Sequence, residues 1–106
     1  MYYDIQLPRS IQGTKLLEAL QETASRLGWR YEQIVESYSV SQGSINVEPQ
    51  QFKVRFRTRR FFGDSARTGD IKPNQSYHEL TVWPGVIFGR ESVEKFTAAL
   101  YEVLQQ

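Results

Sequence analysis

Residues 51–60, QFKVRFRTRR, constrain the fold of this chain more than any other stretch. Successive side chains of an extended strand point to opposite faces, so this alternation predicts a strand with one apolar and one basic face. The apolar positions are Phe52, Val54 and Phe56, and the basic positions are Lys53, Arg55 and Arg57. Such a strand needs a core behind it and leaves its basic face to solvent or to a partner.

Two amphipathic helices are expected to cover the apolar face. The first is predicted to begin at Thr14, as N-cap, and to end at the C′ glycine Gly28, with Trp29 folding back on its last turn. The second is predicted over residues 91–104. Their core-facing stripes follow the helical period and contain Leu16, Leu17, Leu20, Ala24 and Leu27 in the first, and Val93, Phe96, Leu100, Val103 and Leu104 in the second.

Shorter alternating runs predict the remaining strands, at residues 3–7, 33–40, 45–47 and 77–83. Pro8 is expected to close the first strand. In the second, Glu36 shares a face with apolar residues, which indicates either a bulge or exposure on both sides. A turn at residues 41–44 predicts a hairpin, and Pro49 indicates an edge position, a bulge or a break, because proline cannot donate to a ladder.

These elements predict a two-layer α+β sandwich in the order β-α-β-β-β-α. The sheet is expected to be mostly antiparallel, with four to five strands and both helices on one face. Composition agrees with one folded domain over residues 1–106, since 40% of the residues are hydrophobic and 13% aromatic. Residues 60–76 show no periodicity, and long connections of this kind usually carry function. We therefore expect a long loop there.

Several function classes lose support from composition alone. The chain has no cysteine, which removes disulfides, thiolate catalysis and cysteine metal sites, and no run of apolar residues is long enough to span a bilayer. The first ten residues lack the charge and hydropathy pattern of a leader. The expected location is the cytoplasm, with no membrane contact.

The net charge of +1 conceals a basic segment. From Lys53 to Lys72 there are seven cations and two anions, which indicates an anionic partner or neutralisation within the fold. Alternate residues of a strand stand about 6.6–7 Å apart, close to the backbone spacing of single-stranded nucleic acid. The expected anion- or partner-binding residues are Lys53, Arg55, Arg57, Arg59, Arg60 and Arg67. Glutamates on neighbouring strands, Glu36, Glu48 and Glu79, are the candidates for internal neutralisation.

Four aromatic residues are candidate interface or stacking groups: Phe61, Phe62, Tyr77 and Trp83. Trp83 lies on the outward parity of its strand, beside Pro84. An exposed tryptophan often marks an interface, and Trp29 in a helix-to-strand turn is a further candidate.

Catalysis has little support in the sequence. His78 shares the core-facing parity of Leu80 and Val82, which favours a structural histidine. The pairs Gly63-Asp64 and Gly69-Asp70 fit turns better than a phosphate or calcium loop. Gly89 and Arg90 could assist an anion at a helix start, although backbone geometry explains the glycine as well. We predict no catalytic residue, no cofactor and no metal site.

Three functions remain open at this level. The first is a non-catalytic binding or protein-interaction module, such as a small subunit or a homo-oligomer, that uses the basic sheet face and the 60–76 loop. The second is a module that binds single-stranded nucleic acid or another polyanion through the same cations. The third is a small enzyme with an anionic substrate under the loop, in which His78 or Asp64 would act.

Overall fold

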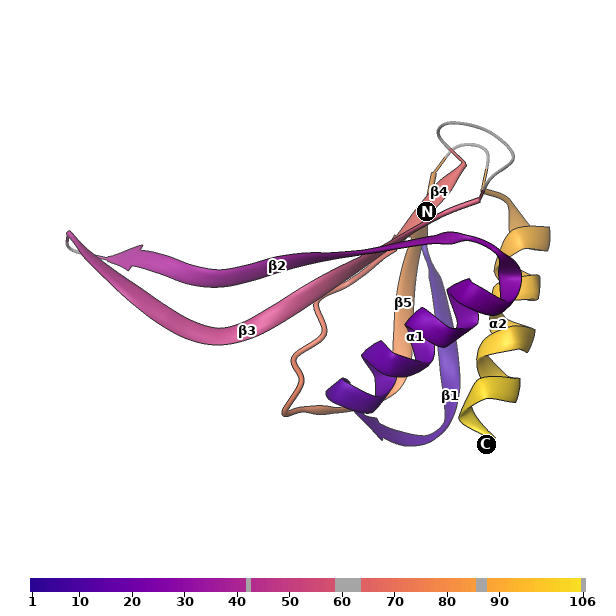
Figure 1. The fold of residues 1–106 in the computed structure, drawn as a ribbon, viewed down its shortest axis with the longest axis horizontal. Helices are drawn as coiled ribbons and strands as arrows, with labels where there is room; N and C mark the ends of the chain where they lie inside the picture. The colour runs from indigo at the N-terminus through magenta and orange to yellow at the C-terminus, as the bar shows by residue number, and fades with distance from the viewer. Residues whose placement is uncertain (42, 59–63, 86–87, 106) are drawn as a thin grey trace.

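The structure is a computed structural model that describes residues 1–41, 43–58, 64–85 and 88–105. The elements follow one another as β1 (Tyr3–Gln12), α1 (Gly13–Leu27), β2 (Arg30–Ser41), β3 (Ser44–Arg57), β4 (Ser65–Thr68), β5 (Ser76–Pro84) and α2 (Arg90–Leu104). All five strands pair antiparallel in one sheet, in the order β1-β5-β4-β3-β2 (Figure 1). The predicted α+β class and order of elements are confirmed.

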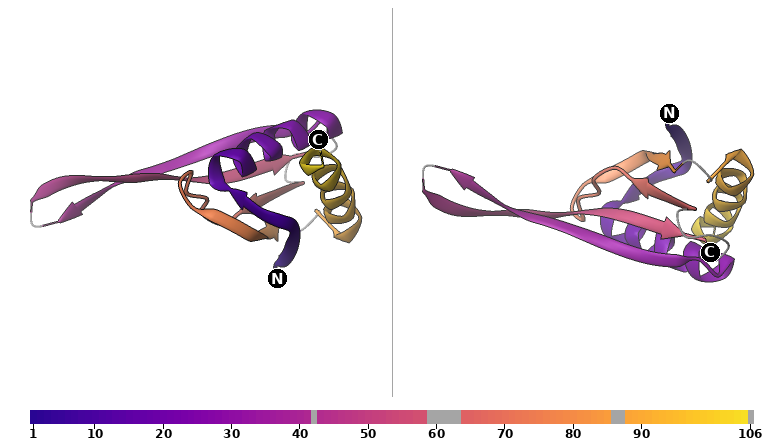
Figure 2. Two further views of the ribbon diagram at one scale, coloured as in Figure 1. Left: turned by 90° about the horizontal axis from the view of Figure 1, so that it is seen from below. Right: turned by 90° about the horizontal axis from the view of Figure 1, so that it is seen from above.

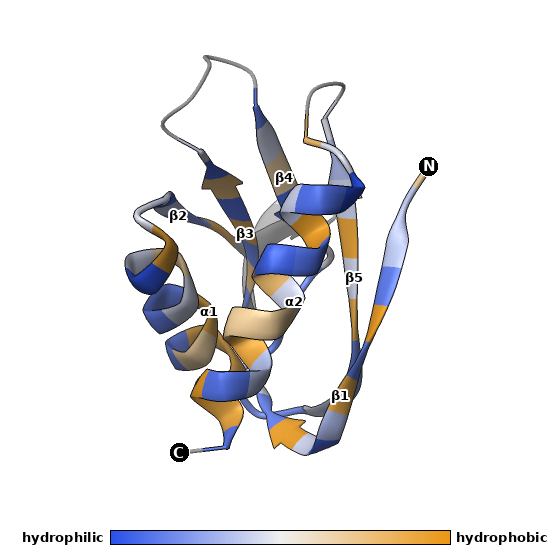
Figure 3. Ribbon diagram, turned by 90° about the vertical axis from the view of Figure 1, so that its right-hand side faces the viewer, coloured by the Kyte–Doolittle hydropathy of each residue, from blue (hydrophilic) through white to orange (hydrophobic). Residues whose placement is uncertain are grey.

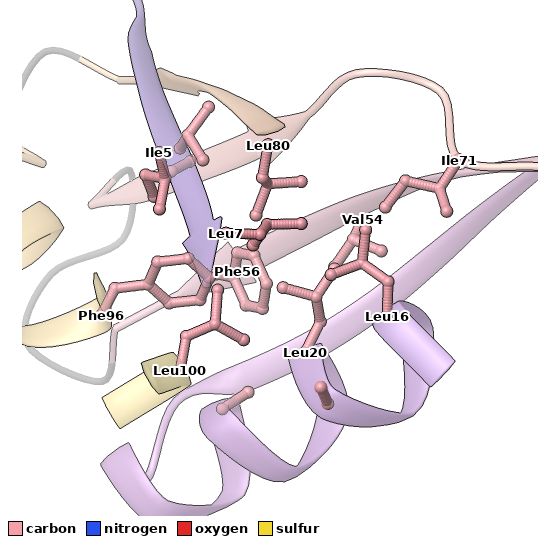
Figure 4. Close-up of a cluster of buried hydrophobic side chains, with 14 of the residues drawn as sticks. Ile5, Leu7, Leu16, Leu20, Val54, Phe56, Ile71, Leu80, Phe96 and Leu100 are labelled. Atoms are coloured by element: carbon pink, nitrogen blue, oxygen red, sulfur yellow. The ribbon is translucent and has the colours of Figure 1, made fainter. Parts of the chain in front are cut away.

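Both helices cover the same face of the sheet, as the sequence predicts (Figure 3). Apolar side chains from the two helices meet those of the sheet in a single core (Figure 4). Val54 and Phe56 of β3 are 0% and 1% exposed, and the Phe56 ring lies 4.8 Å from that of Phe96 in α2. The apolar half of the 51–60 alternation therefore builds the centre of the core, and its basic half faces away from the helices.

The segment predicted as a loop at residues 60–76 contains a strand. β4 lies between β3 and β5, with Ala66 and Thr68 buried against the core and Arg67 on the opposite face. The Thr68 hydroxyl accepts a hydrogen bond from the Val54 N–H at 3.1 Å. Four residues with one small apolar side chain give no readable period, so the pairing of β4 depends on its neighbours in space.

The start of α1 differs from the prediction. β1 does not end at Pro8 but continues to Gln12, because the register between β1 and β5 shifts between Gln6 and Ile11 and Pro8 falls inside that irregularity. The N-cap of α1 is Gln12, without a side-chain hydrogen bond, and Thr14 is not the cap. The Thr14 hydroxyl and N–H both donate to the carbonyl of Pro73, each at 3.2 Å.

Gly13 allows this contact between α1 and the segment before β5. Its N–H donates to the Gln75 carbonyl at 2.7 Å. A Cβ atom at Gly13 would lie 2.0 Å from the Lys72 carbonyl oxygen, well inside van der Waals contact. A side chain of any size therefore cannot replace glycine here without moving the 72–75 segment.

The C-terminus of α1 forms as predicted. Gly28 takes a left-handed conformation with φ of 71°, and the Trp29 N–H donates back to the Ala24 carbonyl at 2.9 Å. The Trp29 ring packs against Phe88 and Phe96, with centroid separations of 5.3 and 6.3 Å. Trp29 thus covers an edge of the core.

Strands β2 and β3 form a hairpin that extends beyond the helices, as Figures 1 and 2 show. Their pairing is regular from Arg30–Arg57 to Glu36–Gln51 and then shifts register before Tyr38–Val47. Pro49 lies in this irregularity, so the bulge considered in the sequence is present and β3 continues through it. We call residues 37–50 the arm, because there the described pairing is between β2 and β3 alone.

Candidate functional site

The face of the sheet away from the helices carries a row of aromatic and charged residues across four strands. Trp83 of β5 lies opposite Arg67 of β4, Arg67 lies opposite Arg55 of β3, and Arg55 lies opposite Glu32 of β2. At the other end of the row, the Tyr2 ring lies 6.0 Å from that of Trp83. Residues far apart in the sequence therefore form one continuous surface.

A second row of cross-strand neighbours lies beside the first row and contains two more arginines. Arg57 lies opposite Arg30 of β2 on one side and Ser65 of β4 on the other. Residues directly opposite in an antiparallel pair have Cβ atoms about 4.5–5.5 Å apart, and like charges there are destabilising. The pairs Arg55–Arg67 and Arg30–Arg57 thus concentrate positive charge. We call this surface the basic face; its members are Arg30, Lys53, Arg55, Arg57, Arg67 and Trp83.

Two carboxylates neutralise part of the basic face. Glu32 lies 3.8 Å from Arg55 and Asp70 lies 3.9 Å from Lys53, both at the long end of the ion-pair range and at partly exposed positions. Within the described part of the chain, Arg67 forms no ion pair. The five cations of the basic face outnumber these two carboxylates, so the seven side chains together keep a net positive charge.

The glutamates considered for internal neutralisation are placed differently. Glu79 of β5 lies opposite Gln6 of β1 and accepts a hydrogen bond from its Nε2 at 3.0 Å, which directs it toward the β1 edge. Glu36 lies opposite Gln51 in the register, and the side chains of Glu36 and Glu48 are outside the described part of the structure. Among the described side chains, the carboxylates of Glu32 and Asp70 form ion pairs with the basic face.

The Trp83 ring packs against Gly69. A Cβ atom on Gly69 would lie 3.3 Å from Cζ3 of the indole, so the ring uses the space left by the missing side chain. The indole remains 38% exposed, as the outward parity predicts. Gly69 therefore leaves room for the ring, and Trp83 stays partly exposed beside the cations of the basic face.

Two hollows flank the indole. One, of about 440 Å³, is lined by Trp83, Arg67, Arg55 and Arg57 together with Met1 and residues 65–66 and 84–85. The other, of about 330 Å³, is lined by Trp83, Arg67, Lys53 and residues 68–70. Trp83 and Arg67 border both hollows. An aromatic surface with cations on either side is the result.

Tyr77 and His78 lie on the faces opposite to those predicted. The register shift in the β1–β5 pair falls beside them, so the inward parity of Leu80 and Val82 does not continue through His78. Tyr77 packs against the core, and its hydroxyl accepts a hydrogen bond from the Lys72 N–H at 2.7 Å. His78 is exposed. Tyr77 is therefore not a stacking group of the basic face, and His78 is not a core histidine.

Four of the predicted site residues, Arg59, Arg60, Phe61 and Phe62, lie outside the described residues. Asp64 next to them is buried; its Oδ2 accepts a hydrogen bond from the Thr58 hydroxyl at 2.7 Å. Neither Asp64 nor His78 lines either of the two hollows beside Trp83. Gly89 is the N-cap of α2 and Arg90 its first residue.

The described residues contain neither a metal-binding cluster nor a membrane-spanning helix. Over the described ranges, no three histidine or acidic side chains gather closely enough to hold a metal ion. In the same ranges, neither helix has the length and apolarity required to cross a bilayer.

The sequence does not reveal Tyr2, Arg30, Glu32, Gly69 or Asp70 as members or neighbours of this surface. Each becomes part of it through strand register or a contact between distant segments. The basic segment from Lys53 to Lys72 is the signal that points to the correct region.

Comparison of the chain with protein-family models, with curated proteins and with solved structures gave no match. The chemistry of the basic face is therefore the guide to function.

Proposed function

We propose that this chain is a non-catalytic binding module whose basic face holds a single-stranded nucleic acid. One observation carries the proposal: the exposed indole of Trp83 lies between Tyr2 and Arg67, and Arg67 lies directly opposite Arg55. Proteins that bind single strands combine aromatic stacking surfaces with a cationic track for the phosphates. Both are present on one open sheet face.

The concentration of charge favours a polyanion over an acidic or apolar protein surface. Arginine and tryptophan are also enriched at protein–protein interfaces, so the argument for a polyanion is the net positive charge of the face, which has five cations against two paired carboxylates. Arg67 and Arg55 lie directly opposite each other, and a phosphate placed between them offsets their mutual repulsion. Arginine also binds phosphate oxygens through two parallel hydrogen bonds.

The shape of the face favours a single strand over a duplex. The hollows on both sides of Trp83 lie next to the indole, so an unpaired base can stack there while its phosphates reach Arg67 and Arg55. Bases inside a duplex are already stacked and cannot do so. We therefore expect a strong preference for single strands.

A protein partner is the second candidate, and the arm favours it. The arm, residues 37–50, contains one glutamate and no lysine or arginine, so it lacks the cations that contact phosphate. A projecting hairpin of this composition suits a protein surface.

Cytoplasmic location remains a prediction from the sequence.

The test is fluorescence anisotropy of a labelled oligothymidylate titrated with the protein. A variant that carries Arg55→Glu and Arg67→Glu removes the opposed pair. A matched control, Lys15→Glu with Lys95→Glu, makes the same change in net charge at exposed positions on the helices. We expect the first variant to lose binding and the control to keep it within about threefold. Equal loss in both variants, or no binding by the wild type at low salt, would overturn the proposal.

A further inference from the structure

The free edge of β2 has no role in the proposed nucleic-acid site. β2 is the last strand of the sheet and pairs on one side only, with β3. It runs from Arg30 to Ser41, longer than most strands, and contains no proline or lysine. Natural edge strands are usually short, bulged or protected by such residues, because a free edge offers backbone donors and acceptors to another strand.

The regular part of this edge is apolar as well as open. Val35 is 50% exposed, although it lies opposite Phe52, which packs against the core. Tyr31 in the same strand is partly buried, and its hydroxyl donates to the Leu17 carbonyl. Burial raises the pKa of that phenol above its ordinary value, and its hydrogen bond from Gln33 lowers it. An apolar side chain exposed beside an unpaired edge favours a partner that supplies a strand.

The sequence of the regular part is self-complementary. Regular pairing with β3 spans Arg30 to Glu36, and Gln33 is the midpoint of this stretch. In an isologous contact the same patch serves both partners, so each residue must suit its symmetry mate. A two-fold axis at Gln33 sets Arg30 against Glu36, Tyr31 against Val35 and Glu32 against Ile34. Opposite charges then meet at both ends, Tyr31 meets Val35 between them, and no like charges lie opposite each other.

We propose that two copies of this chain associate through their β2 edges, antiparallel, about a two-fold axis centred on Gln33. Other registers that keep the two basic faces on one side are less suitable. Centring on Tyr31 sets Arg30 against Glu32 but pairs only residues 30–32 of β2. Centring on Glu32 sets that residue against itself, and centring on Ile34 sets Glu32 against Glu36. Like charges directly opposite each other destabilise a strand pair. Centring on Val35 brings no opposite charges together.

The consequence is one continuous sheet across both copies, with the two basic faces side by side. Arg30, beside Arg57 on the basic face, then lies next to the junction between the copies. A nucleic acid long enough to reach both faces gains affinity through effective concentration. The association itself does not depend on nucleic acid, so the two proposals fail independently.

Because the chain has no cysteine, a single engineered one reports the axis directly. Gln33→Cys sets two thiols opposite each other with Cα atoms about 4.5–5.5 Å apart, within the disulfide range of about 4.4–6.8 Å. Mild oxidation should convert most of this variant to a covalent dimer on a non-reducing gel. The control, Lys15→Cys, has its thiol on the exposed surface of α1 and should cross-link little. Equal cross-linking of both variants would overturn the proposed axis.

Charge reversal tests the register by sedimentation velocity over a concentration series. Arg30→Glu alone and Glu36→Arg alone each create two like-charge contacts and should raise the dimer Kd about tenfold. The double variant, and an equimolar mixture of the two single variants, restore opposite charges and should dimerise like the wild type. Restoration also shows that the single variants are folded. A wild-type chain that stays monomeric at every concentration would overturn the proposal.

Discussion

The two faces of one sheet follow different rules in this protein. On the helix-covered face, Val54 and Phe56 of β3 are fully buried in a core that both helices and the sheet build. On the basic face, Arg55 and Lys53 form long ion pairs with Glu32 and Asp70, and two arginine pairs lie opposite each other in the register. The first face supplies the stability of the fold. The second lies outside the core and concentrates positive charge at the surface of the sheet.

This contrast separates stability from binding. Substitutions on the inner face should change the free energy of unfolding and leave the affinity of the folded molecules unchanged. Substitutions on the basic face should do the reverse. Variants on each face test this separation when both the free energy of unfolding and the oligonucleotide affinity are measured.

Phe56→Ala should produce the largest loss of stability. The ring is 1% exposed and contacts Phe96 across the core, so its removal should cost about 3–5 kcal/mol. Urea unfolding followed by circular dichroism measures the loss. Arg67→Ala, on the opposite face of the adjacent strand, should change stability by about 0.5 kcal/mol or less. Similar losses of unfolding free energy in the two variants would show that the basic face stabilises the fold as much as the core does.

Gly13→Ala should destabilise the protein by about 2 kcal/mol or more. The new Cβ would meet the Lys72 carbonyl oxygen at 2.0 Å, so the contact between α1 and the 72–75 segment must open. Thermal unfolding measures the effect, and oligonucleotide affinity below the transition should match the wild type. An unchanged midpoint would show that this segment does not anchor α1.

Trp83→Ala should weaken binding of a single strand by about 1–3 kcal/mol, the usual contribution of a stacked base. The indole is 38% exposed and rests on Gly69, so stability should change little. Trp29→Ala is the comparison, since that ring packs on Phe88 and Phe96 and should affect stability instead. Isothermal titration and urea unfolding of both variants measure the two quantities. A Trp83 variant that binds normally would remove stacking from the account.

Glu32→Gln should give the smallest effect, a gain in affinity of about twofold to fivefold. The carboxylate lies 3.8 Å from Arg55 and competes with a bound phosphate for that cation. An exposed pair of this kind is worth about 0–1 kcal/mol, which sets the size of the gain. Anisotropy titration at low salt measures it, and Glu94→Gln on α2 is the control. Weaker binding by the Glu32 variant would show that the carboxylate supports the site.

The sequence predicts those parts of the fold that depend on local periodicity. The alternation of Phe52, Val54 and Phe56, and the stripes of the two helices, each repeat often enough to identify the element and its buried side. The outward position of Trp83 follows from the alternation of its own strand, β5, in which Leu80 and Val82 point into the core. Alternation along β3 is therefore sufficient to place Lys53, Arg55 and Arg57 on the face away from the core.

The remainder depends on register, which a single sequence does not encode visibly. The irregularity between β1 and β5 exchanges the faces of Tyr77 and His78, and the contact with Pro73 replaces the expected cap at Thr14. β4 is too short to carry a period and forms because β3 and β5 lie on either side of it. Arg30 and Arg67 join the site only through those pairings.

The salt dependence of oligonucleotide binding tests the central claim most directly. For three to five phosphate contacts on a single strand, the plot of log K against log salt should have a slope of about −2 to −3.5. Arg67→Ala should reduce its magnitude by about 0.7, the value of one contact, while Lys15→Ala on α1 leaves it unchanged. A slope near zero, or a slope that Lys15→Ala alters as much as Arg67→Ala, would contradict a nucleic-acid site on the basic face.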